Sequence, residues 1–452
     1  MRKFIGFLLV LCLLLSVLPV CADAVEFTYG DVAGLQFVGD FFMEITKGGP
    51  ALYAVTDELG NPSMCTESDD WNIKFVYEGD MPTLTLRGAQ IGKYNAEKEE
   101  FYQASAHGIT SYEPTKRFPL TIIVESDSAI ESNRSGINCE GTKDDPWICD
   151  MTIRCVGDAK LSIFAGGRQP GIRSRDLSQY TLTLDNANLD IVNTEEDKIA
   201  VGIQCGRLII NGGSLNLTSV MRCIESTGTV TFNGGNHIFT CNSESIFTAL
   251  YAKESITIND GNIKMYKPLE SGGGCINTGS LTINGGNVYG EGYNYAVKAD
   301  TVEFNGGVVE LKATSDAGDA QIFVEGAPDL ANYQNPFAVL GANAEDFAEY
   351  NIDNATDDEM GYFKLMPKGS SDTPVIPGGD EPAPSETPDA STAPDESKTP
   401  DESKAPDESQ TPGNDAPDSN PLLWVAIAAV VVVVAAAVAF IILRKKKDDC
   451  AE

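Results

Sequence analysis

The stretch Leu281-Thr282-Ile283-Asn284-Gly285-Gly286 is the clearest copy of a six-residue phrase that decides the fold of this 452-residue chain. Further copies, and looser upstream versions of its first three residues, begin at Leu84, Leu120, Leu161, Leu182, Leu208, Val230, Ile256 and Val302. Self-similarity at a spacing of roughly 20–50 residues indicates a solenoid, because no single repeat can bury its own apolar face.

Each repeat also carries a four-residue pattern, which we call a step: a small residue, an apolar residue, a variable residue and a second small residue. Gly202-Ile203-Gln204-Cys205 is an example. Successive steps from Gly108 begin 21 to 35 residues apart, and a third apolar segment follows each Gly-Gly turn. These segments read as three short strands per repeat. We therefore predict an all-β fold, a right-handed parallel β-helix of three-strand coils over residues 81–315. An antiparallel sandwich or barrel is the alternative, but neither requires like residues in every turn.

A solenoid needs folded ends. We assign residues 25–80 to an amino-terminal cap and residues 316–368 to a carboxy-terminal cap. Within the second cap, Asp329 to Tyr350 is rich in Ala, Asn, Phe and Glu and could form a short helix over the last coil.

The fourth position of the six-residue phrase is an asparagine, and these asparagines form a column. Its members are Asn211, Asn233, Asn259, Asn284 and Asn305. An exposed amide row could bind a sugar, but we favour a structural role in which each side chain caps its turn and tolerates left-handed backbone beside glycine.

The two ends of the chain predict an exported, anchored protein. Residues 1–24 have the pattern of a secretory signal peptide. Residues 421–443 form an apolar transmembrane helix, continuous from Leu422 to Leu443, and the basic start of the 444–452 tail places that tail in the cytoplasm. Residues 369–420 are rich in Pro, Asp, Glu and Ser and predict an extended, disordered stalk. We expect a single-pass cell-membrane protein whose amino-terminal region is extracellular.

The formal net charge of −34 excludes a nucleic-acid-binding role, which needs clustered Lys and Arg. It also disfavours acidic glycans unless a divalent cation bridges the two anions. Acidic loops offer oxygen ligands for calcium, although solvated surface charge is the favoured interpretation. The candidate ligands are Asp144, Asp145, Asp158, Glu195, Glu196 and Asp197.

Aromatic residues supply the candidate sugar contacts. Tyr289, Tyr293 and Tyr295 lie in one short segment with a carboxylate and an amide, a composition able to stack on sugar rings and hydrogen-bond hydroxyls. We expect Tyr293 and Tyr295 to be the most exposed. Trp147 is a further candidate, although it could equally fill a gap in the core.

The cysteines of the solenoid fall into columns. Cys139 and Cys205 share one position of the four-residue step, and Cys223 and Cys275 share another. One coil intervenes within each pair, so about 9.6 Å separates the partners, beyond the ~7 Å limit for a disulfide. We predict small core residues here. Whether Cys149 and Cys155 pair is left open.

Leu182 to Leu189, the Gly-Ile-x-small steps and the Asn-Gly-Gly turns resemble those of secreted β-helical carbohydrate-binding-domain proteins of anaerobic Gram-positive bacteria. These proteins are relatives of the pectate-lyase superfamily, and the resemblance covers residues 25–366. It implies binding of acidic cell-wall polysaccharide through calcium, without cleavage. It carries no ligand residue over to this chain.

Some members of that superfamily are lyases that use calcium-binding acidic residues and a basic proton abstractor. Arg168, Arg173 and Arg175 cluster in one loop and could supply such a base, but we favour arginines that are solvated or paired with carboxylates. Of the two histidines, His237 aligns with an inward position, so no Ser-His-Asp or Cys-His set can be proposed.

We therefore expect a monomeric, non-catalytic surface solenoid that binds a polysaccharide or a host or cell-surface glycan, or acts as an adhesin. The alternatives are a polysaccharide lyase or hydrolase, and a protein-binding or structural spacer.

Overall fold

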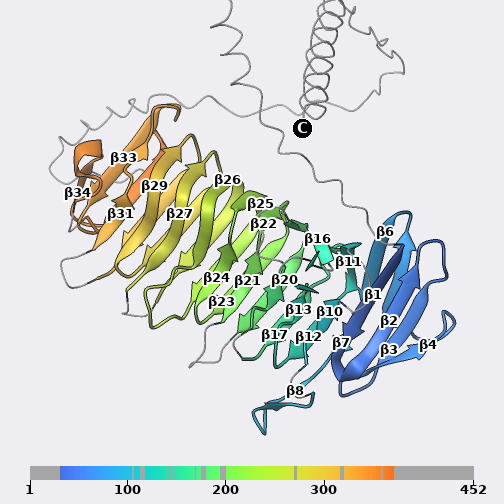
Figure 1. Ribbon diagram of the computed structural model, residues 1–452. Helices are drawn as coiled ribbons and strands as arrows, with labels where there is room; N and C mark the ends of the chain where they lie inside the picture. The colour runs from blue at the N-terminus through green and yellow to red at the C-terminus, as the bar shows by residue number, and fades with distance from the viewer. Residues whose placement is uncertain are drawn as a thin grey trace, which may run out of the picture. The chain divides into compact units, whose positions relative to one another are not determined.

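The computed structural model describes residues 31–103, 106–111, 118–139, 141–142, 145–146, 148–167, 169–174, 180–193, 200–268, 272–315, 320–357 and 360–370. They form an almost entirely β structure in which 31 strands belong to one sheet wound as a solenoid (Figure 1). The all-β solenoid predicted from the repeats is confirmed.

The strands fall into three columns, which we call A, B and C, and within each column successive strands pair in parallel. Column A contains β10 (Ile109–Ser111), β13 (Ile137–Asn138), β18 (Ile172–Arg173), β21 (Val201–Cys205), β24 (Arg222–Ser226), the first parts of β26 (Leu250–Tyr266), β27 (Gly274–Ile283) and β29 (Tyr295–Phe304), and β31 (Gln321–Glu325). It holds the small-apolar steps of the sequence.

Column B holds the six-residue phrases and their looser upstream versions, except the one at Leu161, which lies in column C; Met151-Thr152-Ile153 takes its place in column B. Its strands are β6 (Met81–Arg87), β11 (Phe118–Ser126), β16 (Ile148–Cys155), β19 (Thr181–Asp185), β22 (Arg207–Ile210), the first part of β25 (Thr229–Cys241), the middle of β26, the ends of β27 and β29, and β32 (Pro328–Asp329).

Column C follows the turns. Its strands are β7 (Gln90–Ile91), β12 (Ser128–Ser132), β17 (Leu161–Ala165), β20 (Asn188–Asn193), β23 (Ser214–Ser219), the ends of β25 and β26, β28 (Asn287–Gly292) and β30 (Val308–Ala313). In the later coils a single strand runs through a corner, so the expected three separate strands per coil merge.

The core is a stack of like side chains. In column A the register places Ile203, Ile224, Leu250, Ile276 and Val297 directly over one another, each at most 1% exposed. This stacking, predicted from the four-residue steps, removes apolar side chains from water in every coil, which is the main stabilising term of folding.

The cysteines lie where the columns predicted. Cys223, Ala249 and Cys275 occupy successive coils, and Cys139, Cys205, Cys223 and Cys275 are buried free thiols. Burial raises the pKa of Cys205 to about 12, so this thiol stays protonated and unreactive. Cys155 is also a free thiol, and the Cys149 side chain lies outside the described part of the chain.

Antiparallel strands close both ends. At the amino end lie β1 (Val32–Phe37), the one-turn 3-10 helix η1 (Val38–Asp40), β2 (Phe41–Thr46), β3 (Leu52–Thr56), β4 (Pro62–Cys65) and β5 (Ile73–Glu78). β1 pairs antiparallel with β10, and β5 pairs antiparallel with β6. Two small hairpins project from the coils, β8 (Tyr94–Asn95) with β9 (Glu100–Phe101), and β14 (Gly141–Thr142) with β15 (Asp145–Pro146).

At the carboxy end, β35 (Tyr362–Pro367) pairs antiparallel with both β30 and β33 (Pro336–Gly341), and β34 (Phe347–Glu349) pairs with β33. The short helix expected within Asp329–Tyr350 is wrong. Phe337 to Leu340 instead continue the apolar surface as a strand, and only a 3-10 turn, η2 (Ile352–Asn354), follows.

The asparagine column is structural, but not as turn caps. Asn233 donates from Nδ2 to Asn211 Oδ1, Asn259 to Asn233, Asn284 to Asn259 and Asn305 to Asn284, each at 2.8 Å. Left-handed backbone at these turns falls on glycines instead, for example Gly286 at φ +79°. The strand spacing of about 4.8 Å brings each amide within reach of the next, so the asparagines form a ladder along the solenoid.

Among the residues that the structure describes, no helix is long and apolar enough to cross a membrane. The predicted signal peptide, transmembrane helix and cytoplasmic tail lie outside those residues, as does the predicted stalk apart from Gly369 and Ser370, and all four stay predictions.

Candidate functional site

A groove follows the outer face of column C along the solenoid axis. Alternate residues of a strand point to the same side, so parallel pairing turns them into rows that run along the axis. One wall is the amide row, which we define as Asn236, Asn262 and Asn287, and Val308 continues it. The other wall is the mixed row, which we define as Ile238, Lys264, Tyr289 and Glu310. Between them lies a hollow of about 500 Å³.

The floor of the groove is formed by inward residues, including His237, Ile263 and Val288. His237 is 1% exposed, its Nε2 lies 2.8 Å from the Gly234 carbonyl oxygen, and its ring stacks at 15° on Phe239. Burial lowers the pKa of His237, which favours the neutral imidazole. The predicted inward placement of this histidine is confirmed.

The amide row is a second asparagine ladder. Asn262 Nδ2 donates to Asn236 Oδ1, and Asn287 Nδ2 donates to Asn262 Oδ1, both at 2.7 Å. An amide has two N–H donors and two acceptor lone pairs, and the ladder uses one of each on Asn262. The exposed amide therefore keeps one donor and one acceptor for a ligand. A sugar hydroxyl, which both donates and accepts, matches that pair.

Tyr289 is held firmly in the mixed row. Its hydroxyl donates to Glu291 Oε2 at 2.6 Å and accepts a hydrogen bond from Lys312 Nζ at 3.4 Å. The Tyr266 ring packs against it at a centroid distance of 5.7 Å. Burial, and then the hydrogen bond and charge of Glu291, raise the pKa of Tyr289, so the phenol stays neutral. A side chain fixed in this way loses little conformational entropy when a ligand binds.

The charges around the groove leave one cation unneutralised. Glu310 lies 3.4 Å from Lys312 Nζ and 3.6 Å from Lys364 Nζ. Among the ion pairs of the described residues, Lys264 has none, and its side chain is exposed. The groove is therefore locally tolerant of an anion, even though the chain as a whole is strongly acidic.

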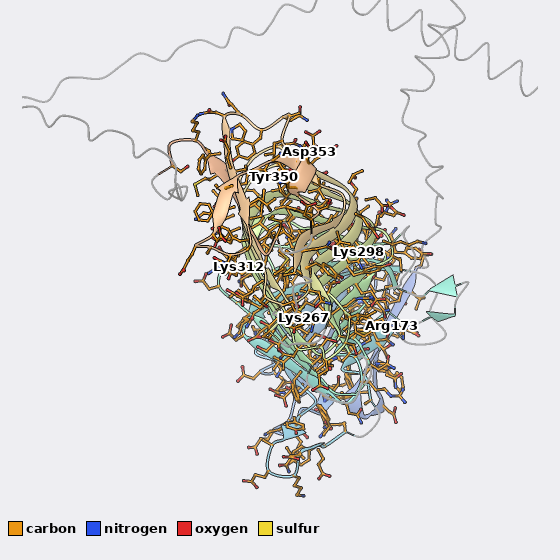
Figure 2. All side chains as sticks on the ribbon, turned by 90° about the vertical axis from the view of Figure 1, so that its left-hand side faces the viewer. Arg173, Lys267, Lys298, Lys312, Tyr350 and Asp353 are labelled. Atoms are coloured by element: carbon orange, nitrogen blue, oxygen red, sulfur yellow. The ribbon has the colours of Figure 1, made fainter. Side chains whose placement is uncertain are left out.

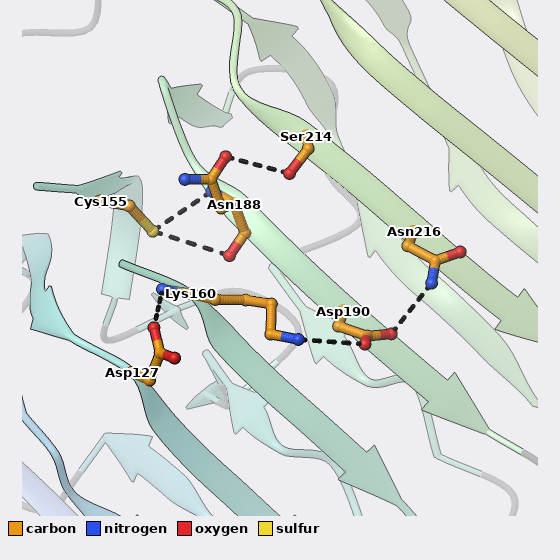
Figure 3. Close-up of polar contacts among 7 residues, drawn as sticks. All are labelled: Asp127, Cys155, Lys160, Asn188, Asp190, Ser214 and Asn216. Carbon is orange, nitrogen blue, oxygen red and sulfur yellow. Dashed lines mark hydrogen bonds and ion pairs between the residues drawn. The ribbon is translucent and has the colours of Figure 1, made fainter. Parts of the chain in front are cut away.

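The same face continues toward the amino end with smaller polar groups (Figure 3). Lys160 Nζ lies 3.7 Å from Asp190 Oδ2, and Asn216 Nδ2 donates to Asp190 Oδ1 at 3.4 Å. Asp190 and Asn216 occupy the mixed-row position in earlier coils. These contacts satisfy one another, so this part of column C offers fewer free groups than the groove.

The structure separates the three tyrosines predicted to act together. Only Tyr289 lies in the groove. Tyr293 is in the turn after β28, and Tyr295 starts β29 in column A, where it pairs with Gly274. Figure 2 shows the same separation in the labelled residues, with Lys312 of column C on one side of the solenoid and Lys298 of column A on the other.

All three tyrosines are half-buried, and the expectation that Tyr293 and Tyr295 are the most exposed stays a prediction. A Cβ added to Gly274 would lie 2.4 Å from Tyr295 Cδ2, which shows that the ring covers this glycine. Burial is also the main reason why the pKa of Tyr295 is raised to about 12.

Most of the predicted calcium ligands cannot be placed. Asp144, Glu195, Glu196 and Asp197 lie outside the described residues, as do the side chains of Asp145 and Trp147. Asp158 is exposed in the turn between β16 and β17. In the described part of the chain no three His, Cys, Asp or Glu side chains are grouped to hold a metal. Calcium binding stays a prediction.

Of the candidate bases, only Arg173 is described. It points outward from column A beside a hollow of about 250 Å³ that Gln204 and Glu225 also line. Arg168 and Arg175 lie outside the described residues.

Lys264, Tyr266 and the amide row were missed in the sequence, although one signal was present. An asparagine follows the turn glycine directly in Gly235-Asn236, Gly261-Asn262 and Gly286-Asn287. Comparison with known proteins gives no match to a family model, a curated protein or a solved structure.

Proposed function

We propose that this chain is a right-handed parallel β-helix of the carbohydrate-binding-domain type that binds glycan in the column C groove without cleaving it. The observation that carries the proposal is the groove itself, a hollow of about 500 Å³ with amides on one wall and Tyr289 on the other. Ligand sites usually have this size and combine apolar lining with a few fixed polar groups.

The chemistry of each wall suits a sugar. Ile238 and the Tyr289 ring offer apolar contact to the C–H faces of a pyranose ring. Asn262 offers a free donor and a free acceptor to its hydroxyls. Lys264 can pair with the carboxylate of an acidic sugar, so at this groove an acidic polysaccharide needs no bridging calcium.

The location of the protein at the cell surface is part of the same proposal. A signal peptide at 1–24, a stalk at 369–420 and an anchor at 422–443 would hold the solenoid outside the cell as a monomer. Binding of a polysaccharide or a host or cell-surface glycan is then the role expected of a surface-displayed groove.

The test is a glycan array probed with the full-length chain in detergent, with calcium and with a chelator. We expect Tyr289→Ala to weaken binding about tenfold, equivalent to about 1.4 kcal/mol, through lost apolar contact. Tyr251→Ala is the matched control, because Tyr251 is also half-buried and outward-facing but lies in column A. No bound glycan, or equal loss in both variants, would contradict the proposal. Unsaturated product that disappears in Arg173→Ala would replace it with a lyase.

A further inference from the structure

One wall of the groove repeats the same asparagine side chain at regular intervals along the axis, whereas the opposite wall changes from coil to coil. Its walls are built from four successive coils, at Asn236 and Ile238, Asn262 and Lys264, Asn287 and Tyr289, and Val308 and Glu310. Three steps of about 4.8 Å give the groove a length of about 14 Å. A ligand that extends along it meets an asparagine amide in three successive coils, with a different side chain of the mixed row opposite each one.

The ladder makes those contacts uniform in direction. Both hydrogen bonds of the amide row run the same way, with each Nδ2 donating toward the coil before it. The amide planes are therefore oriented alike, and the unused donor and acceptor of Asn262 recur in the same sense at its neighbours. A branched or single terminal sugar would use one such step and leave the others empty.

We propose, resting on the function proposed above, that the ligand is an internal segment of a linear, extended glycan that lies parallel to the solenoid axis. One sugar ring occupies about one coil step, because the advance per ring of an extended 1,4-linked chain is close to the strand spacing. The chemical class is an extended β-1,4-linked polymer, neutral or carboxylated. A glycan that coils cannot keep its rings in step with the rows.

A series of cello-oligosaccharides, compared with maltohexaose, separates the effect of chain shape from that of sugar composition. Cello-oligosaccharides of two to six glucose units are extended, and maltohexaose is a coiled chain of glucose. With the full-length chain in detergent, we expect calorimetry to show affinity for cello-oligosaccharides rising about fivefold per ring, the value of about one net hydrogen bond, and levelling at about four rings. Maltohexaose should bind at least about tenfold more weakly than cellohexaose, because only its first rings fit.

Two asparagine variants locate the contact. Asn262→Ala should weaken cellohexaose binding about fivefold, since it removes the free amide at the centre of the groove. Asn259→Ala is the matched control, because it breaks two bonds of the other ladder, three residues away, without lining the groove. It should leave cellohexaose affinity unchanged.

The results of these experiments distinguish failure of the axial arrangement from failure of the proposed function. The axial arrangement is overturned, and the proposed function stays intact, if binding depends on Tyr289 but affinity does not grow with chain length. The same conclusion holds if maltohexaose binds as tightly as cellohexaose. If no glycan of the array, no cello-oligosaccharide and no maltohexaose binds, both the axial arrangement and the proposed function are overturned. The length series uses the unmodified chain, so it decides the matter even if a variant does not fold.

Discussion

Replacing Asn259 by alanine tests the first ladder at its centre. The side chain donates to Asn233 Oδ1 and accepts from Asn284 Nδ2, both at 2.8 Å. A hydrogen bond between neutral groups contributes a net of about 0.5–1.5 kcal/mol, and these amides are exposed, so each bond is worth the lower half of that range. The expected loss in the free energy of unfolding is therefore about 1–2 kcal/mol. Urea unfolding followed by far-ultraviolet circular dichroism measures it.

The end of the ladder supplies the internal control. Asn305 donates one bond, to Asn284, so Asn305→Ala should cost about half as much, about 0.5–1 kcal/mol. The two substitutions change the same chemical group in the same kind of turn. A cost for Asn259→Ala no larger than that for Asn305→Ala would refute the reasoning that the ladder bonds stabilise the solenoid.

Two further predictions concern the turns and the core. Gly286→Ala should lower the free energy of unfolding in urea by about 3 kcal/mol or more, because φ is +79° and the new Cβ would lie 2.4 Å from the Gly261 carbonyl oxygen. Gly48→Ala is the control, because φ is +74° there but the new Cβ would lie in open space, so it should cost only about 1 kcal/mol. Equal costs would rule out the clash at Gly286. Burial lowers the folded-state pKa of His237, so the unfolded chain takes up the proton first and stability falls as pH drops below 6.5, by at most about 1.4 kcal/mol per pH unit. His237→Phe should lack this component, and an unchanged difference between the two proteins from pH 7 to pH 5 would contradict the assignment.

The fold could be predicted because the repeats encode the core directly. Ile203, Ile224 and Leu250 each follow a small residue in the sequence, and each is stacked and buried in the structure. Solenoid coils contact mainly their neighbours, so the spacing of like residues along the chain predicts which side chains pack together.

The ladders could not be predicted from a single turn. Asn259 beside Asp260-Gly261 has the local composition of a turn cap, and glycine alone was enough to satisfy the left-handed backbone. The amide was then free to bond the next coil. That bond depends on the distance between coils and not on any local preference.

The site was predicted only in part, because a corner lies within the tyrosine segment. Residues two apart share a face only while the strand continues. Between Tyr289 and Tyr295 the chain leaves β28 and enters β29, so the third tyrosine joins column A. Lys264 carried no local signal, since its role follows from the absence of an ion pair among its described neighbours.

The reversed strands at the two ends have a consequence for how such molecules coexist. A bare parallel stack is a template onto which the first coil of another molecule could add, and then another, without limit. Here Glu310 faces Lys364 on a strand of opposite direction, and Thr110 faces Gln36 on another. An incoming copy therefore finds neither the right polarity nor matching rows. The reversed strands at both ends therefore disfavour end-to-end addition of a second molecule.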